Sequence, residues 1–354
     1  MISDESVALN RAYFDAKAER FHSAFESAPA ARTLELLPLL FFLGNCSRKK
    51  SWREAVAADL LCGDGHFVKG LDGCFRHVHG VDLSPGLLGY FPKTATTTAT
   101  ITALDESSEI LKSKIKPDAI ISVAGLHHIY SMKNGAVDPA LSDARQVEVL
   151  ANWMNCLPKD GVMVIADIPD PDSVGNYSLA DRDWQIHDSI LEDRVKSRVE
   201  ALAHELKLPS VPWQARPDTI KDYVRQVLEF SHCSQRAQPG QWFREVVAKQ
   251  SLFGHVDHFP IPANLLPKLK AHGYAVEYYD LPTPLMFASL DAALFFMYEA
   301  FALGPRVRSV VEIPDASRQV LKEQIAEHLG IQTLSAGQVS VGWRSGYFVV
   351  TRPN

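Results

Sequence analysis

The sequence predicts an α/β fold, a Rossmann-like doubly wound sheet with helices on both faces. Short apolar runs rich in β-branched residues recur along the first half of the chain, and stretches with helical periodicity separate them. A glycine pair, Gly63 and Gly65, follows the first run, where a strand would turn into a helix. Such alternation is typical of parallel strands joined by helical crossovers.

Seven strands are expected. The first five lie at residues 55–61, 77–83, 98–102, 118–125 and 161–168, and the last two at 274–281 and 346–352. Ligands of such sheets bind beyond the carboxyl ends of the strands, so the residues at those ends are the candidate site. About a hundred residues separate the fifth strand from the sixth, where one helix would suffice. This interruption predicts a mostly helical cap.

Helical periodicity within and after the interruption supports this division. Trp184, His187, Leu191, Val195 and Val199 recur at steps of three or four, as on one face of a helix. Further helices are expected near 219–230, 290–303 and 316–328. We therefore expect a helical lid at 1–50, an α/β core at 51–170, a cap at 171–262 and the C-terminal part of the core at 263–354.

Composition limits the functional classes. The net charge of −6 and the isoelectric point near 6.1 disfavour nucleic acid as a partner. Five cysteines without a CxxC pair indicate neither a zinc knuckle nor a disulfide framework. The N-terminus lacks the blocks of a signal peptide, and the longest apolar run, which contains Pro38, is too short for a bilayer. We expect a cytoplasmic protein with no membrane partner.

The glycine turn and the second strand together indicate a nucleoside ligand. Gly63 and Gly65 would let backbone N–H groups approach a ligand, although a tight turn without ligand has the same pattern. A dinucleotide fingerprint needs a third glycine where Val68 stands, which disfavours NAD. Asp82 ends the second strand and could accept both ribose hydroxyls, or it could be a solvated acid before a turn that Ser84 caps.

Several segments resemble the class I S-adenosylmethionine-dependent methyltransferases. "VAADLLCGDGHF" and "HGVDLSPGLL" resemble the first two motifs of that family, and "PDAIISVAGLHHI" and "LPKDGVMVIADIP" its fourth and fifth strands. "HGYAVEYYDLPTP" and "GYFVVTRP" resemble its last two strands, of which the final one is antiparallel. "NRAYFDAKAERFHSAF" resembles the N-terminal helix that closes over the cofactor. Leu61 stands where the family usually has its first glycine.

The resemblance implies S-adenosylmethionine as cofactor and assigns its contacts. Asp59 would lie near the amino group, Gly63 and Gly65 behind the sugar and methionine, Asp82 at the ribose and Asp105 at the adenine. The remaining implied cofactor contacts are Cys62, Leu83, Ala124, Leu126 and Tyr13.

Histidines carry the catalytic prediction. His127 and His128 end the fourth strand and, by resemblance, face the methyl group, where one imidazole could act as a base. Neighbouring residues of an extended segment point opposite ways, so we expect only one to face the substrate and prefer His128. Alternatively, one ring packs under the loop and the other bonds a backbone carbonyl. Asp167, at the end of the fifth strand, could orient such a histidine.

The acceptor side is predicted from aromatic and histidine residues. The expected substrate contacts are Phe21, Trp184, His187, Tyr223 and His255. His255, Asp257 and His258 could together bind zinc or iron, but three donors so close in sequence rarely form a complete shell, and no metal is expected.

The predicted function is methyl transfer to an oxygen or carbon of a small, partly apolar metabolite, in a possible homodimer. The alternative is an inactive binding or scaffold protein with this fold, which Leu61 favours. A nicotinamide-dependent reductase is opposed by Val68 and by the histidine pair.

Overall fold

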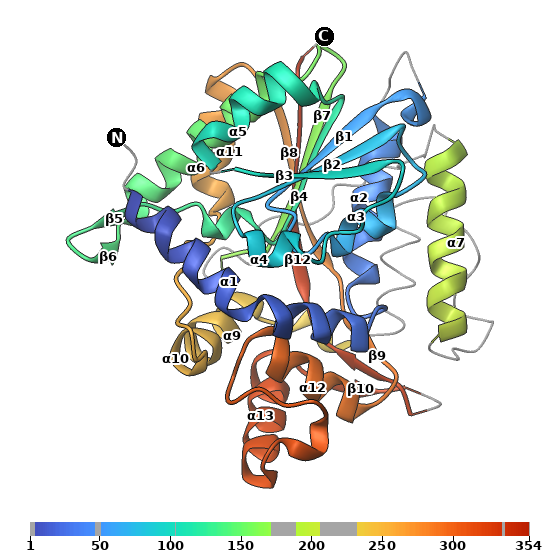
Figure 1. Ribbon diagram of the computed structural model, residues 1–354, viewed down its shortest axis with the longest axis vertical. Coiled ribbons are helices and arrows are strands. Elements are labelled where there is room, and N and C mark those ends of the chain that lie inside the picture. Colours follow the sequence, from blue (N-terminus) through green and yellow to red (C-terminus); the bar gives the residue numbers. More distant parts are fainter. Residues whose placement is uncertain are drawn as a thin grey trace.

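A seven-stranded mixed sheet forms the centre of the molecule (Figure 1). The computed structural model describes residues 4–46, 51–102, 104–170, 189–205, 232–334 and 337–353. The strand order is β3-β2-β1-β4-β7-β12-β8. The strands are β1 (Val56–Leu60), β2 (His77–Asp82), β3 (Thr97–Ile101), β4 (Ala119–Val123), β7 (Val162–Asp167), β8 (Ala275–Pro282) and β12 (Arg344–Thr351).

Strand directions confirm the predicted sheet. The first five strands run parallel, and β12 is antiparallel to both of its neighbours, β7 and β8. Strands β1, β4 and β7 are buried along their whole length, because helices cover both faces of the sheet. This explains why these segments appear as continuous apolar runs.

Two layers of helices cover the sheet. On one face lie α2 (Thr33–Asn45) and α3 (His66–Leu71), and on the other α5 (Leu104–Ile110), α6 (Pro139–Met154) and α11 (Pro262–Ala271). Alternate residues of β1 supply the two cores: Ala57 packs with α2 and α3, whereas Ala58 packs with α6 and α11. None of the described helices combines the length and apolar character needed to cross a membrane.

Helix α1 (Asp4–Ser27) crosses the carboxyl ends of the strands (Figure 1). Asp15 Oδ1 accepts hydrogen bonds from Gly86 N at 3.0 Å and Ser84 Oγ at 2.6 Å, at the start of α4 (Pro85–Leu88), which Ser84 caps as predicted. Helix α2, by contrast, is buried from Leu34 to Gly44 inside the helical layer. Within residues 4–46, the described part of the lid expected at 1–50, only α1 covers the strand ends.

The described part of the expected cap divides between two places, because residues 232–262 supply Phe243 and His255 to the strand ends, whereas α7 (Ser189–Glu205) does not reach them. Helix α7 buries Leu191, Val195 and Val199 against the core that contains α2, as its periodicity predicts. It therefore adds an outer layer to that face and does not cover the strand ends (Figure 1). Trp184, His187 and Tyr223 lie outside the described residues.

A second, smaller unit is inserted between β8 and β12, and we call residues 283–343 the C-terminal insertion. Its three-stranded antiparallel sheet has the order β10-β11-β9, and helices α12 and α13 pack beside it. The bounds are β9 (Leu285–Phe287), α12 (Leu290–Ala300), α13 (Asp315–His328), β10 (Ile331–Thr333) and β11 (Val339–Val341). Residues 263–354 were expected to form the C-terminal part of the core; α11, β8 and β12 do so, whereas the C-terminal insertion between β8 and β12 packs into a separate apolar core.

Short elements complete the fold. They are η1 (Trp52–Glu54), η2 (Leu111–Ile115), η3 (Leu126–His128), β5 (Met132–Lys133), β6 (Ala136–Val137), η4 (His232–Gln235), α9 (Pro239–Trp242), η5 (Phe243–Val247), α10 (Ala248–Gln250) and η6 (Val310–Glu312). Of these, η3 and the loop after α10 contribute to the site described next.

Candidate active site

A pocket with about 1080 Å³ of empty space, its open mouth included, lies at the carboxyl ends of β1, β2 and β4. Three parts of the chain line it. The strand ends contribute Leu61, Cys62, Gly63, Asp64, Asp82, Leu83, Ala124, Gly125, His127 and His128; α1 contributes Phe14, Lys17, Phe21 and Phe25; later segments contribute Phe243, His255, Leu285, Phe296, Ala300, Phe301 and Trp343.

The two glycines of the first turn have different roles. Both adopt left-handed backbone conformations, with φ of 56° at Gly63 and 78° at Gly65. A Cβ at Gly65 would lie 2.5 Å from Pro92 Cδ, so this glycine is needed for internal packing, and it does not line the pocket. A Cβ at Gly63 would meet nothing closer than 3.8 Å. Only Gly63 leaves its backbone open to a ligand.

Asp82 joins the turns after β1 and β2. Its Oδ2 accepts a hydrogen bond from Gly63 N at 2.8 Å, and its Oδ1 accepts one from Ser84 N at 2.8 Å. Burial raises the pKa of Asp82 to about 6, against the opposing effect of the backbone N–H groups. Each carboxylate oxygen can accept a further bond. Asp82 can therefore still receive hydroxyl groups from the pocket.

A second, small cavity of about 210 Å³ adjoins the first. It is lined by Leu60, Leu61, Val81, Asp82, Leu83, Thr102, Ser107 and Trp153. Leu61, Asp82 and Leu83 line both cavities, so they stand where the two meet. Asp82 beside a mostly apolar lining is the chemistry that a ribose and its aromatic base require, so the residues present fit an adenosine group. The slot itself holds little more than a water molecule in this structure, so the base would enter it only after neighbouring side chains move.

Leu61 has an unusual backbone for its position. Its φ of 60° is left-handed, a conformation that costs a residue with a Cβ about 1–2 kcal/mol. Gly125 accommodates its side chain, because a Cβ there would lie 2.6 Å from Leu61 Cβ. The turn thus keeps the backbone conformation that glycine favours. The side chain of Leu61 occupies the boundary between the two cavities.

Three other predicted cofactor contacts do not line the larger pocket. Asp59 is 2% exposed within β1, its Oδ2 has no hydrogen-bond partner, and burial and the Asp82 charge raise its pKa. Leu126 is fully buried in the core that contains α6. Tyr13 turns its hydroxyl to Lys17 Nζ, which donates to it at 3.0 Å. Asp105 lies in α5, but its side chain is not among those described.

Both histidines of the "HH" pair line the pocket. The expectation that only one does was wrong, because it assumed an extended segment. Residues 126–128 form the 3₁₀ turn η3, in which successive side chains are about 120° apart. The ring centroids of His127 and His128 are 4.0 Å apart.

Asp167 orients His127. Its Oδ1 lies 2.7 Å from His127 Nδ1, and its Oδ2 accepts a hydrogen bond from the His127 backbone N–H at 3.1 Å. The other ring nitrogen, Nε2, is left for the pocket. His128 is held differently: burial first, then its histidine neighbours, lowers its pKa well below the ordinary value, and its Nδ1 has no hydrogen-bond partner.

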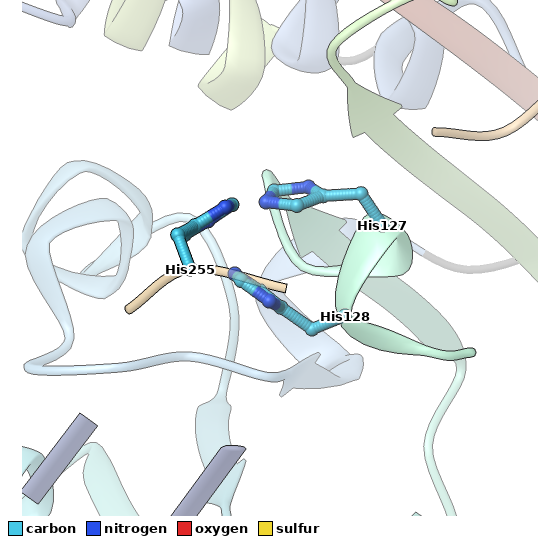
Figure 2. A group of neighbouring side chains, drawn as sticks. All are labelled: His127, His128 and His255. Carbon is cyan, nitrogen blue, oxygen red and sulfur yellow. The ribbon is translucent and has the colours of Figure 1, made fainter. Parts of the chain in front are cut away.

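His255 comes from the loop after α10 and completes a group of three rings (Figure 2). One ligand nitrogen from each of His127, His128 and His255 lies within 4.8 Å of the others. His258 takes no part, because its Nε2 lies 2.8 Å from Asp143 Oδ1 and its backbone N–H donates to His127 O at 2.8 Å. The trio considered from sequence, His255 with Asp257 and His258, therefore does not converge on the pocket.

Lys17 is a pocket residue that the sequence analysis missed. Its side chain is buried, and Nζ lies 4.3 Å from the centroid of the Tyr13 ring and 4.9 Å from that of Phe14. Among the described residues no carboxylate lies within ion-pair distance of it. Burial, with a smaller effect of Arg20, lowers its pKa to about 7. The sequence could have indicated this position, because Lys17 lies four residues from both Tyr13 and Phe21 and therefore on the same apolar stripe of α1.

Comparison with known proteins shows only distant likeness. No family model and no curated protein matches the sequence. Similar solved structures include the cyclopropane synthase MmaA2 from Mycobacterium tuberculosis, with 11% identity, a TM-score of 0.46 and coverage of 98% of both chains. YcgJ from Bacillus subtilis has 11% identity and a TM-score of 0.40, covering 90% of this chain and 99% of its own. A complex of DhpI with SAH has 13% identity and a TM-score of 0.41, covering 99% and 100%.

Because these likenesses are weak, the fold assignment depends on the sheet itself. The sheet has seven strands in the order β3-β2-β1-β4-β7-β12-β8, and its last strand, β12, is antiparallel, as the resemblance implied. The glycine turn after β1 and the acid at the end of β2 lie at the carboxyl edge of this sheet, beside the pocket. The chain has the class I methyltransferase fold.

Proposed function

We propose that this protein is an S-adenosylmethionine-dependent methyltransferase that methylates an oxygen or carbon of a small, partly apolar molecule. The observation that carries the proposal is the position of Asp82. This buried carboxylate ends β2, contacts the Gly63 turn and lines both cavities. Asp82 would accept the ribose hydroxyls, and the adenine would lie beside Leu83 and Trp153. Gly63 would leave room for the sugar and the methionine portion of the cofactor.

The acceptor side of the pocket supports a small, partly apolar substrate. Phe243, Phe301 and Trp343 provide apolar walls, and Phe21 lies on α1. Lys17 adds one hydrogen-bond donor within these apolar surroundings. Sites of this kind, apolar with a few polar groups, are typical of small-molecule binding. We infer that the acceptor carries an oxygen function that Lys17 contacts.

His127 is the residue best placed to accept a proton. S-adenosylmethionine supplies an electrophilic methyl group when bound, and the protein must align the acceptor with it. Asp167 holds the Nδ1 side of His127, so Nε2 can take the acceptor's proton and the carboxylate stabilises the resulting imidazolium. The lowered pKa makes His128 a weaker base. The geometry therefore supports His127, although the sequence favoured His128.

Calorimetric titration with S-adenosylhomocysteine, with NADH as the comparison ligand, tests the cofactor assignment. We expect binding of S-adenosylhomocysteine alone. Asp82→Ala should weaken it about 100-fold, since two hydrogen bonds to a charged group each contribute about 1.5 kcal/mol. Asp143→Ala is the matched control, because Asp143 is a buried, hydrogen-bonded carboxylate that lines neither cavity. Unchanged affinity in a folded Asp82→Ala variant would overturn the proposal.

One observation favours the second candidate, an inactive binding protein. Leu61 occupies the boundary between the two cavities, where the family usually has glycine. If the chain binds neither S-adenosylhomocysteine nor S-adenosylmethionine, this candidate is supported. Once an acceptor is found, His127→Ala should lower kcat by about 10²- to 10⁴-fold under the methyltransferase proposal.

A further inference from the structure

Three imidazole rings meet at the inner wall of the pocket. His127 and His128 project from η3, and His255 reaches them from a loop more than a hundred residues later in the chain (Figure 2). The centroid of the His255 ring lies 5.9 Å from that of His127 and 5.2 Å from that of His128. All three residues are at most 9% exposed. The fold thus brings together three buried nitrogen donors that are separate in sequence.

The three rings do not satisfy one another. Among the hydrogen bonds of the described residues, none joins two of these rings, and His128 Nδ1 is buried with no partner. A buried polar atom without a partner costs about 1–3 kcal/mol. The surroundings are aromatic: Phe14 lies 4.7 Å from His128 and Phe243 lies 5.0 Å from His255, centroid to centroid. The partners of the rings lie outside the cluster, namely Asp167 for His127, the Val256 backbone for His128 and Asp257 for His255, so the second nitrogen of each ring is left for a ligand.

Carboxylates stand behind two of the rings. Asp167 Oδ1 lies 2.7 Å from His127 Nδ1, and Asp257 Oδ2 lies 2.8 Å from His255 Nδ1. Histidines that bind metals usually direct the second ring nitrogen to a carboxylate or carbonyl, which fixes the ring and strengthens the donor. The negative charges of Asp167 and Asp257 would also favour a bound cation, whereas a protonated Lys17 would repel it.

We propose that His127, His128 and His255 bind one divalent transition-metal ion, zinc in particular, with an open coordination position that faces the pocket. Three neutral imidazoles suit zinc, copper or iron more than magnesium or calcium. All three residues line the pocket, so a fourth ligand would come from the pocket itself. Three protein ligands and one exchangeable position are typical of catalytic zinc sites.

The role of the ion depends on the proposed function, whereas its binding does not. An acceptor hydroxyl at the open position would lose its proton to solvent, because a zinc-bound oxygen has a strongly lowered pKa. The oxygen would then form a bond to the methyl carbon. The electron pair of the sulfur–carbon bond would stay on sulfur, which gives S-adenosylhomocysteine. In this scheme His127 is a ligand and not the base.

The test uses the full chain, stripped with a chelator and titrated with Zn²⁺ and with Co²⁺ as a spectroscopic probe. We expect one ion per chain, visible cobalt bands of a four- or five-coordinate site, and X-ray absorption from three imidazole nitrogens at about 2.0–2.1 Å. His127→Ala and His255→Ala should each weaken binding at least about 100-fold. Asp257→Asn should weaken it about 10- to 100-fold, as loss of a supporting carboxylate does.

His66→Ala is the matched control. His66 is another histidine of the same pocket, but it lies against Phe25 and outside the cluster, so this variant should bind the ion like the wild type. Less than about a tenth of an ion per chain in the wild type would overturn the proposal, as would wild-type affinity in both His127→Ala and His255→Ala. If a variant does not fold, the cobalt and X-ray absorption spectra of the wild type test the proposal, because they report the number of imidazole ligands directly. Titration of the stripped chain with S-adenosylhomocysteine tests the proposed function separately.

Discussion

The two halves of the pocket are built in different ways. The cofactor half comes mainly from residues 60–83, where one turn and one strand end determine the geometry, while Thr102, Ser107 and Trp153 close the small cavity. The acceptor half combines α1, the loop with His255 and the C-terminal insertion, which are far apart in sequence. The first half therefore depends on local backbone conformation, and the second on long-range packing. This difference decides which substitutions should damage each half.

The largest expected effect is on the contact that holds α1 to the C-terminal insertion. Arg20 Nη2 lies 2.9 Å from Glu299 Oε1, Nε lies 3.0 Å from Oε2, and both side chains are buried. Arg20→Ala would leave the Glu299 charge buried without its partner, which should cost about 3–5 kcal/mol. Urea denaturation measures the change.

An exposed pair between the same two regions is the control. Arg306 Nη2 lies 2.6 Å from Glu19 Oε1, and these side chains are 49% and 59% exposed. Arg306→Ala should cost no more than about 1 kcal/mol, because solvent screens the pair. Similar losses in Arg20→Ala and Arg306→Ala would show that burial of the first pair is unimportant for holding the acceptor half together.

The next effect concerns Lys17. Its folded pKa of about 7 lies below the ordinary 10.5, so between these values the folded chain binds fewer protons than the unfolded chain. The resulting destabilisation is complete below pH 7 and fades as the pH rises to 10.5. Lys17→Met should therefore stabilise the protein by about 4 kcal/mol at pH 7 and by about 1 kcal/mol at pH 9.5, since each pKa unit corresponds to about 1.36 kcal/mol. Equal stabilisation at pH 7 and pH 9.5 would mean that water reaches the Lys17 amine through the pocket mouth and keeps its pKa near the ordinary value.

The same difference explains what the sequence could predict. The positions of the sheet strands, the turn at Gly63 and the acid at Asp82 follow from periodicity and from a local motif, and the structure agrees with them. The side-chain directions of His127 and His128 could not be predicted from the sequence, because the 3₁₀ turn η3 replaces the expected extended segment. His255 joins them only through packing of distant segments.

The C-terminal insertion was the main error in the predicted architecture. Its helices were expected, but periodicity does not reveal that β9, β10 and β11 leave the main sheet and form their own. Helix α7 shows the same limit. Its buried face was predicted from its periodicity, but its partner, α2, was not. A pattern predicts that a helix buries a face, and only the tertiary structure shows against what.

A smaller effect is expected for the pH dependence of cofactor binding. Burial raises the pKa of Asp82 to about 6, so at pH 5 only about a tenth of the free chains carry the carboxylate that ribose hydroxyls need. The affinity for S-adenosylhomocysteine should be about 10-fold weaker at pH 5 than at pH 7.5. In Asp82→Asn this dependence should disappear. If it persists there, another group is responsible.

The smallest effect, and the sharpest test of the local half, is expected at Leu61. Leu61→Gly would remove about 1–2 kcal/mol of backbone strain at φ 60°. It would also lose packing and add chain entropy to the unfolded state, so stability should change by less than about 1 kcal/mol. Removing the side chain joins the two cavities.

Leu61→Ala separates these contributions, because it removes most of the side chain but keeps the strained backbone. Both variants should bind S-adenosylhomocysteine about three- to fivefold more tightly by calorimetry, a gain of less than about 1 kcal/mol. Only Leu61→Gly should also keep the wild-type melting temperature. If both variants bind the ligand more weakly, Leu61 is itself a cofactor contact. The ligand would then lie against its side chain, and the departure from glycine would be an adaptation of the site.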